Sequence, residues 1–568
     1  MKKLERTLSL PGAIAVSIGG MLSGIFVLPG LAVGITGSSV WLAFLVAALC
    51  ILPAVLSKSE LGTAMPKSGG TYVYIERAFG PLFGTIAGIG LWLSLLLKSA
   101  FSLVGLSAYL YVVVNIDEAY TKAIALLALL LIFLLNVFGL KKVEKTQLFI
   151  VSTSIISLIV IIALGLTSFD TKLTEPVFSD GTNGFIAGVA FLYISYAGVT
   201  KIAAIAGEIT NPSKNLPLTM IISLFLITTI YCLVALALVG NVEASILATD
   251  IKPIHTLFQT IGGDTFGLIA GVVGALTLLS MANSGVLASS RFPFAMSKDG
   301  LLPSYLAGIN SKFMTPVSAI LTTSTLIALA IIFLDVVKIA KLASAFKVLM
   351  FIFNELTVIV LRETNAQWYK PTFKSPMYPY VQIFGILSGI VLLAYLGIMP
   401  VVSVIGVVIL GFLIFLVYGS KSDRSGIASS YGILSFFRKD ASKIREYSEE
   451  TENTEDSITT KAEVVVPLLG EETSPETLVE MAAALKSTNE VQAFDITEVP
   501  NQTDSSVFME DSPESTSLKR RIKRLSDSKD LNVGFEAVVT YELSQTINKL
   551  SSQESCEWLV MGLSLIHI

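Results

Sequence analysis

Long apolar runs separated by short polar loops fill the first 420 residues of the chain. Twelve of these runs contain about 18 or more residues, the length of a helix that crosses a bilayer. The predicted helices are residues 11–34, 39–57, 82–113, 122–139, 148–167, 184–206, 217–240, 265–290, 316–334, 339–361, 381–398 and 400–418. The pattern predicts an all-α polytopic membrane domain with twelve transmembrane helices in residues 1–420.

The pattern changes after Gly419. Residues 421–460 are polar and charged, and they predict a flexible linker. Strand-like and helix-like segments then alternate through residues 461–568, which predicts an α/β domain with parallel strands. The predicted strands are 462–469, 491–497, 533–540 and 558–562, and the predicted helices are 474–485, 515–527 and 541–552.

Charge supports this division and gives the orientation. Charged residues make up 14% of the chain, against about 25% in soluble proteins. The short loops on one side of the predicted helices carry 16 Lys and Arg residues, and those on the other side carry 5. Because basic loops face the cytoplasm, we expect a multi-pass protein of the cell (inner) membrane. Both termini, and therefore the α/β domain, are expected in the cytoplasm.

The chain is poor in residues that build catalytic or metal sites. Its three cysteines lie far apart, and it has two histidines. We find no metal-ligand cluster, nucleophile elbow or phosphate-binding loop in the sequence. We therefore expect no enzyme activity, no metal, no cofactor and no nucleic-acid partner. The sequence does not indicate an oligomeric state.

Glycines interrupt the first predicted helix. The stretch Ser17–Pro29 contains three glycines and ends in a proline, and both residue types weaken an α-helix. Inside a membrane, broken backbone is tolerated only where protein buries it or where it lines a cavity. The freed amides of Ser23, Gly24 and Ile25 would then be available to a carboxylate at the start of the following half-helix. The alternative is close helix packing through small residues.

The sixth predicted helix is interrupted in the corresponding place. Ser195, Tyr196 and Gly198 lie near the middle of residues 184–206, and Lys201 follows within one turn. Helices one and six each open a set of five helices. Matched interruptions in two halves indicate a transporter site between inverted repeats. The halves would be residues 11–167 and 184–361.

Two lysines inside the membrane helices are candidates for coupling to an ion. Lys98 lies in the middle of helix three, where a lysine is costly unless it faces a cavity or a partner. Together with Lys201 it is a candidate proton or ion site. The alternative for Lys98 is a structural lysine bonded to carbonyls of a broken helix.

Polar residues in two further helices have alternative roles. Ser280, Asn283 and Ser284 lie on one face of helix eight, where they would suit a sodium ion beside the broken helix one. The alternative for these three residues is hydrogen bonding between helices. For Asn136 in helix four we predict such an inter-helix hydrogen bond.

Several stretches within the first 420 residues resemble the amino acid–polyamine–organocation (APC) permease superfamily. They are Ser23–Pro29, Pro66–Tyr72, Tyr196–Gly198 with Asn211, Pro212 and Pro217 beyond it, and Ser290–Gly300. The resemblance implies a five-plus-five inverted repeat (LeuT-like) with two additional helices, working by alternating access. It implies that the substrate is an amino acid.

The resemblance also implies roles for the two interruptions. The residues implied to receive the substrate carboxylate are Ser23, Gly24 and Ile25. The residues implied to surround its amino group are Ile194, Ser195, Tyr196 and Gly198. Tyr196 would lie where relatives place a gating aromatic side chain.

Departures from the family pattern bear on the substrate and on coupling. Many relatives have an acidic residue two positions after Gly198, where this chain has Thr200, and this favours a neutral amino acid over a cationic one. Many relatives also have a glycine at the position of Leu22. Some relatives use a helix-five lysine in place of sodium and move a proton, but helix five here carries the hydroxyl group Ser152–Ser154. Coupling to a proton is therefore only slightly favoured over coupling to sodium.

The tail from about residue 461 to 562 resembles a universal stress protein domain. Members that bind ATP have a glycine-rich loop after the fourth strand, whereas this chain ends in Gly562–Ile568 without that loop. We therefore predict an incomplete domain at 461–568 in which ATP binding is not expected. The alternative to a nucleotide-binding domain is a folded cytoplasmic module that only docks or stabilises.

Together these features predict a secondary active transporter that imports amino acids with a coupled proton or sodium ion. One alternative is a membrane-anchored amino-acid sensor, and another is an amino-acid exchanger. The paired broken helices favour transport, because a sensor needs no alternating access.

Overall fold

The chain is described by a computed structural model that covers most of both predicted regions. The described residues are 8–65, 71–114, 120–138, 143–310, 315–364, 369–419, 462–470, 472, 474–485, 491–498, 513–529, 531–540, 543–552 and 556–562. They belong to two compact units, which are treated separately below. The predicted linker 421–460 and the last residues, 563–568, lie outside the described residues, as does most of the Pro66–Tyr72 motif.

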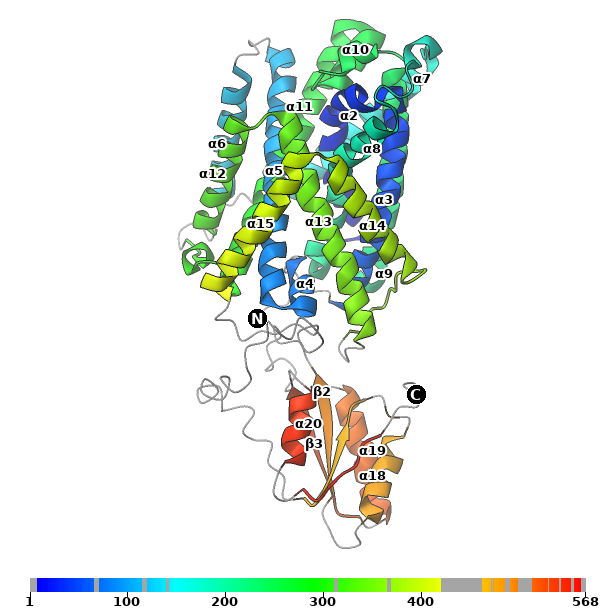
Figure 1. Ribbon diagram of the computed structural model, residues 1–568, viewed down its shortest axis with the longest axis vertical. Coiled ribbons are helices and arrows are strands. Elements are labelled where there is room, and N and C mark those ends of the chain that lie inside the picture. Colours follow the sequence, from blue (N-terminus) through cyan, green and yellow to red (C-terminus); the bar gives the residue numbers. More distant parts are fainter. Residues whose placement is uncertain are drawn as a thin grey trace. The chain divides into compact units, whose positions relative to one another are not determined.

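The first unit is built from helices (Figure 1). The α-helices are α1 (Leu10–Gly19), α2 (Ser23–Thr36), α3 (Val40–Ala64), α4 (Tyr72–Phe79), α5 (Pro81–Val114), α6 (Thr121–Phe138), α7 (Val143–Thr167), α8 (Gly181–Leu192), α9 (Pro212–Val239), α10 (Ala244–Leu247), α11 (Pro253–Lys298), α12 (Val317–Phe333), α13 (Val336–Glu363), α14 (Tyr380–Tyr395) and α15 (Ile398–Val417). The 3-10 segments are η1 (Gly37–Ser39), η3 (Thr171–Thr174), η4 (Tyr193–Glu208) and η5 (Ser304–Ala307).

Nine stretches of the described chain are long and apolar enough to cross a membrane. The first of them, Leu10–Ala64, contains α1, α2 and α3, while α12 and α14 are apolar but shorter. Each of the twelve predicted ranges falls on a helical part of the chain. The prediction of a polytopic helical membrane protein is confirmed, and the number of twelve crossings stays a prediction.

The first unit exposes apolar side chains and buries polar ones. Leu127, Phe149 and Phe225 are about two-thirds exposed, whereas Lys98 and Glu355 are buried. Soluble proteins rarely expose extended apolar surface. This distribution therefore matches a surface that faces lipid and an interior that holds the polar groups.

Two helices begin earlier than the apolar pattern predicted. Helix α9 begins at Pro212 rather than at Pro217, because a proline is favourable at the first helical position. Pro217 cannot donate to the carbonyl of Ser213, and the Thr372 hydroxyl donates to that carbonyl instead, at 3.5 Å. Helix α11 begins at Pro253 and has a non-helical residue at Gly263 (φ 75°), so the predicted range 265–290 is its second part.

The second unit contains a four-stranded parallel sheet between helices. The strands are β1 (Val464–Leu468), β2 (Val491–Glu498), β3 (Val533–Thr540) and β4 (Trp558–Leu559), in the order β3-β2-β1-β4. The helices are α18 (Pro475–Ala484), α19 (Pro513–Lys529) and α20 (Leu543–Ser551).

Strand β1 shows why the sheet has a helix layer on each face. Successive side chains of a strand point to opposite faces. Val464 and Val466 pack in a cluster with α18 and α19, and Val465 packs in another with α20. A strand that is buried on both faces has to be apolar throughout, as the sequence of β1 is.

Candidate functional site

The predicted break in the first apolar run lies between α1 and α2. Helix α1 ends at Gly19 and helix α2 begins at Ser23, with a turn between them. The amide of Gly24 donates to the Met21 carbonyl at 3.0 Å, and that of Ile25 to the Leu22 carbonyl at 3.3 Å. Two of the three amides that were expected to be free are therefore used by the turn itself.

The sixth apolar run changes its helix type instead of unwinding. Helix α8 ends at Leu192, and the sixteen residues of η4 continue as a 3-10 helix. Such helices rarely exceed three or four residues, and a 3-10 stretch within a helix often marks a hinge or strain. The residues expected to interrupt the run, Ser195, Tyr196 and Gly198, all lie in η4.

The two irregular segments touch each other directly. A side-chain carbon added to Gly24 would lie 2.7 Å from Ser195 Oγ, and one added to Gly198 would overlap the Gly20 carbonyl. Close packing through small residues, one of the two alternatives for these glycines, is therefore realised. The Ser23 and Ser195 hydroxyls are buried beside this contact, and the described part of the chain offers them no hydrogen-bond partner.

Lys98 on α5 joins both segments. Its ammonium donates to the Gly20 carbonyl at 3.0 Å and to the Ile194 carbonyl at 3.4 Å. Gly20 caps the C-terminus of α1, where the helix dipole favours a cation. The structure thus gives Lys98 the geometry expected of a lysine bonded to broken-helix carbonyls, and one side chain contacts both interruptions.

A small cavity lies beside this contact. It is lined by Gly20, Lys98, Gly198, Lys201 and Gly285, among others, and offers about 20 Å³ of space for a water molecule. That space holds about one water, whereas small-molecule sites usually have at least about 300 Å³. This cavity is far smaller than an amino acid, because the two segments pack on each other.

The polar face of the eighth predicted helix, which is the second part of α11, does not bond to the break between α1 and α2. Asn283 Oδ1 accepts a hydrogen bond from Asn136 Nδ2 at 2.8 Å, so the inter-helix bond predicted for Asn136 is confirmed. The Ser284 hydroxyl donates to the carbonyl of Met281 in its own helix. Among the described residues, no hydrogen bond links Ser280, Asn283 or Ser284 side chains to α1 or α2. The Ser284 carbonyl does accept a bond from Lys201 Nζ, at 3.4 Å.

Tyr196 packs away from the contact between the two segments. Its ring is buried against Phe44 and Tyr231, and its hydroxyl donates to the Phe44 carbonyl at 3.0 Å. The role of a gating aromatic stays a prediction for this side chain.

Two tyrosines that the sequence analysis missed bind carbonyls near the break. The Tyr231 hydroxyl donates to the Met21 carbonyl at 2.6 Å, and that of Tyr109 to the Phe26 carbonyl at 2.7 Å. A buried tyrosine needs a partner for its hydroxyl. A tyrosine in an otherwise apolar helix was the available signal, but it does not say which carbonyl is bound.

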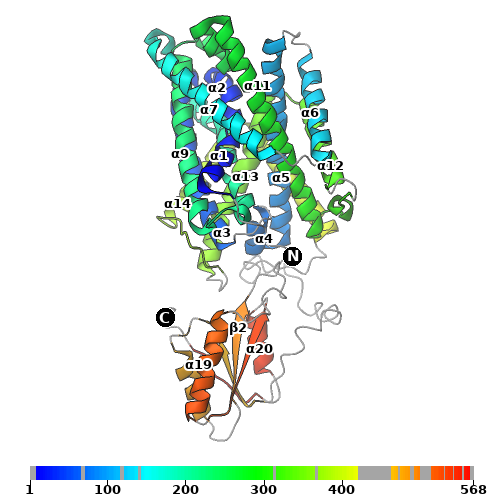
Figure 2. The same cartoon turned by 180° about the vertical axis from the view of Figure 1, so that it is seen from behind.

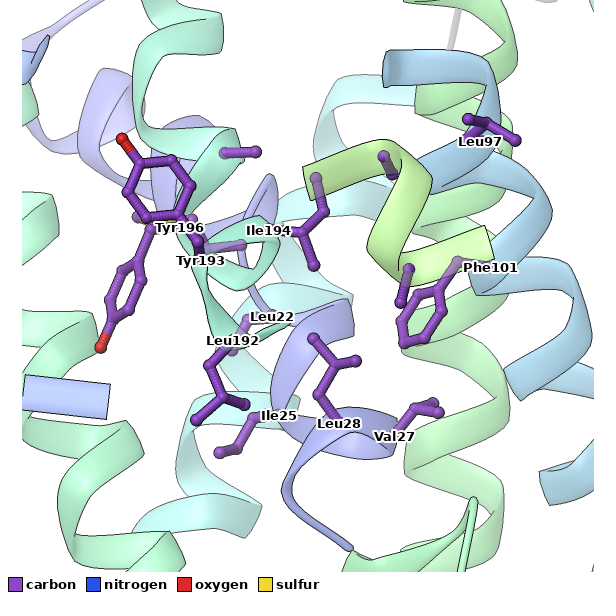
Figure 3. Close-up of a cluster of buried hydrophobic side chains, with 14 of the residues drawn as sticks. Leu22, Ile25, Val27, Leu28, Leu97, Phe101, Leu192, Tyr193, Ile194 and Tyr196 are labelled. Carbon is purple, nitrogen blue, oxygen red and sulfur yellow. The ribbon is translucent and has the colours of Figure 1, made fainter. Parts of the chain in front are cut away.

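Apolar side chains surround the contact. Leu22 and Ile25 belong to one buried cluster with Leu192, Ile194 and Phe101 (Figure 3). Because of this cluster, a ligand that entered between α2 and η4 would meet mainly hydrocarbon beyond the polar backbone.

Helix α1, which ends at the break, packs against α7 and α9, and Figure 2 shows it next to them from behind.

Comparison with known proteins shows extended similarity over the first unit. A family model described as amino acid permease matches residues 8–436. A branched-chain amino acid permease of Bacillus subtilis is 26% identical over 442 residues, which cover 74% of this chain and 95% of the relative. A serine/threonine exchanger of the same organism is 28% identical over 403 residues, which cover 67% of this chain and 89% of the relative. A cationic amino acid transporter of Arabidopsis thaliana is 25% identical over 384 residues, which cover 64% of this chain and 63% of the relative.

Proposed function

The chain belongs to the amino acid permease family, and on this premise we propose that it is a secondary active transporter that imports neutral amino acids. The observation that carries the proposal is the direct contact between the break of α1 and α2 and the segment η4, which Lys98 joins. In this conformation the contact is closed. An amino acid can bind there only after the two segments separate, which is the movement that alternating access requires.

In the proposed mechanism the substrate lies between α2 and η4. Its carboxylate would approach the N-terminus of α2 at Ser23, Gly24 and Ile25, where the helix dipole is positive. Its amino group would approach the carbonyls near Ile194 and Ser195. The fold would be a five-plus-five inverted repeat with two further helices and twelve crossings, with both termini in the cytoplasm.

The proposal of a neutral substrate rests on three observations. Position 200 holds a threonine where a cationic substrate would favour an acid, and the surroundings of Leu22 and Ile25 are apolar. Two of the relatives reported above are named for branched-chain amino acids and for serine and threonine. The name of the third relative points to cationic substrates, so arginine belongs in the test.

Uptake into liposomes that contain the full chain tests the proposal. Radiolabelled leucine, serine and arginine are offered with an inward proton gradient, an inward sodium gradient, or neither. A transporter accumulates at least one of them under a gradient. A sensor binds its ligand without accumulating it, and an exchanger accumulates label only when the liposomes are preloaded with unlabelled amino acid. Stronger uptake of arginine than of leucine and serine would contradict the neutral assignment.

The coupled ion is proposed to be a proton. Lys98 and Lys201 line one small cavity, and either ammonium could take part in proton movement when the contact opens. The face with Ser280, Asn283 and Ser284 is the weaker candidate for sodium, because Asn283 is already bonded to Asn136.

The second unit is proposed to be a universal stress protein-like domain that does not take part in transport. Its sheet has its own buried clusters, and a domain with its own core usually folds independently. Deleting residues 421–568 should leave the initial uptake rate within about twofold of that of the full chain. Quantitative immunodetection of correctly inserted protein provides the normalisation, and complete loss of uptake by inserted protein would show that the tail is essential.

A further inference from the structure

A buried carboxyl group lies away from the two interruptions, on α13. The side chain of Glu355 is 1% exposed, and it packs where α3, α13 and α14 contact one another. Glu355 Oε2 accepts a hydrogen bond from the Ser57 hydroxyl at 2.6 Å. Among the described residues, Glu355 Oε1 is buried without a hydrogen-bond partner. The carboxyl thus has one donor for its two oxygens.

No cation neutralises this carboxyl in the described part of the chain. The described charged side chains on the elements packed against α13 are Lys58 and Glu60 on α3, Glu76 and Arg77 on α4, Lys98 on α5 and Lys201 on η4. Those on α13 itself, besides Glu355, are Lys338, Lys341, Lys347, Arg362 and Glu363. Arg362 forms a two-pronged ion pair with Glu60, with N–O distances of 2.8 and 2.5 Å. Lys347 donates to the Thr200 hydroxyl at 3.3 Å and lies over the ring of Phe351.

The absence of a counter-charge decides which form of the carboxyl fits this site. A buried carboxylate that lacks both an ion-pair partner and a full set of donors is strongly disfavoured. The neutral acid has only a hydroxyl and a carbonyl to satisfy. In this conformation Glu355 therefore fits its surroundings as a group that holds a proton.

A chain of polar groups leads from Glu355 toward the end of α13. The Gln382 amide donates to the Ser57 hydroxyl at 3.2 Å and to the Ser375 hydroxyl at 3.0 Å. The Ser375 backbone amide donates to Glu60 at 2.7 Å. Glu60 in turn pairs with Arg362, whose side chain is 18% exposed. The buried carboxyl is thus linked through polar groups to a partly exposed end of the helix.

We propose that Glu355 binds the proton that is transported with the amino acid. It takes up this proton as the helices close and releases it when their movement admits water or a cation to Oε1. The proposal rests on the function proposed above and adds a proton site on α13 to the site between α2 and η4. It does not require Lys98 or Lys201 to change charge.

The full chain in liposomes tests this with three variants and two assays. Glu355→Gln keeps the shape but cannot lose a proton, Glu355→Asp keeps a titratable group, and Glu363→Gln is a control on the exposed end of the same helix. One assay measures accumulation of the best wild-type substrate among leucine, serine and arginine under an inward proton gradient, with a pH-sensitive dye inside. The other measures counterflow without a gradient, which needs no net proton movement.

For Glu355→Gln we expect counterflow to persist, gradient-driven accumulation to fall about tenfold or more, and the substrate-dependent dye signal to disappear. Glu363→Gln should match the wild type in both assays. If Glu355→Gln loses both activities, recovery of gradient-driven accumulation in Glu355→Asp supports the proposal, and no recovery contradicts it.

Two further outcomes overturn the proposal. One is that Glu355→Gln accumulates substrate as well as the wild type does. The other is that a sodium gradient, and not a proton gradient, drives accumulation by the wild type, in which case the proposed transport function would still stand. If the wild type neither accumulates nor exchanges any of the three amino acids, it is the proposed transport function that fails.

Discussion

Replacing Gly24 by leucine should reduce amino acid uptake to background, a loss of about a hundredfold or more. Even the first side-chain carbon would lie 2.7 Å from Ser195 Oγ and 2.9 Å from Ser195 Cα, so the added bulk meets backbone as well as a side chain. A leucine there would force α2 and η4 apart and cover the N-terminus of α2, which is proposed to receive the substrate carboxylate. Initial rates of uptake into liposomes measure the effect, with the amount of inserted protein determined in parallel.

A second glycine provides the matched control for this substitution. A side-chain carbon added to Gly406 on α15 meets no atom of the described residues within 4 Å, so Gly406→Leu should transport normally. Gly24→Ala is a smaller substitution at the same contact and should lower uptake less. Adding Ser195→Gly to Gly24→Ala removes two of the three atoms closest to the new side chain, so the double variant should regain part of the uptake that Gly24→Ala loses. Normal uptake by Gly24→Leu would rule out the proposed substrate site.

Replacing Lys98 by alanine should alter how uptake depends on pH and on the driving cation, because the variant lacks one of the two lysines proposed to take part in proton movement. The substitution leaves the Gly20 and Ile194 carbonyls without their shared donor, and a buried group that loses its partner costs about 1–3 kcal/mol. If that cost falls on the closed conformation needed for turnover, uptake decreases roughly tenfold. Uptake measured from pH 5 to pH 8, with sodium and without it, tests the prediction.

An exposed lysine controls for the general effect of removing a positive charge. Lys338 pairs with Asp335 beside the start of α13, and its side chain is 54% exposed. Lys338→Ala should therefore leave the profile unchanged. If Lys98→Ala has lower uptake but the same pH and cation profile as the wild type, Lys98 is a structural residue only.

The sequence was sufficient to locate the helices because their apolar runs are long. Bilayer thickness requires about 20 apolar residues per crossing, and this requirement does not depend on tertiary contacts. The break before Ser23 was also predictable, because glycine weakens a helix wherever it occurs. The first residue of α9 was not, since the apolar run begins after Pro217 whereas the helix begins at Pro212.

The contacts inside the candidate site could be narrowed to alternatives but not decided. Glycines in Ser17–Pro29 suit both free amides and close packing, and only the position of Ser195 shows that packing occurs. Lys98 was recognisable as an unusual residue, but its two carbonyl partners lie on segments 78 and 96 residues away. The 3-10 geometry of η4 was not expected, because the same residues are compatible with an unwound segment.

The closed contact between Gly24 and Ser195 has a consequence for binding strength. Because the protein's own atoms fill the place proposed for the ligand, only molecules in which the two segments have separated can bind. The apparent dissociation constant then rises in inverse proportion to the open fraction. Such an arrangement gives weak apparent binding even where the contacts of the open state are favourable, as suits a protein that has to deliver its cargo rather than store it.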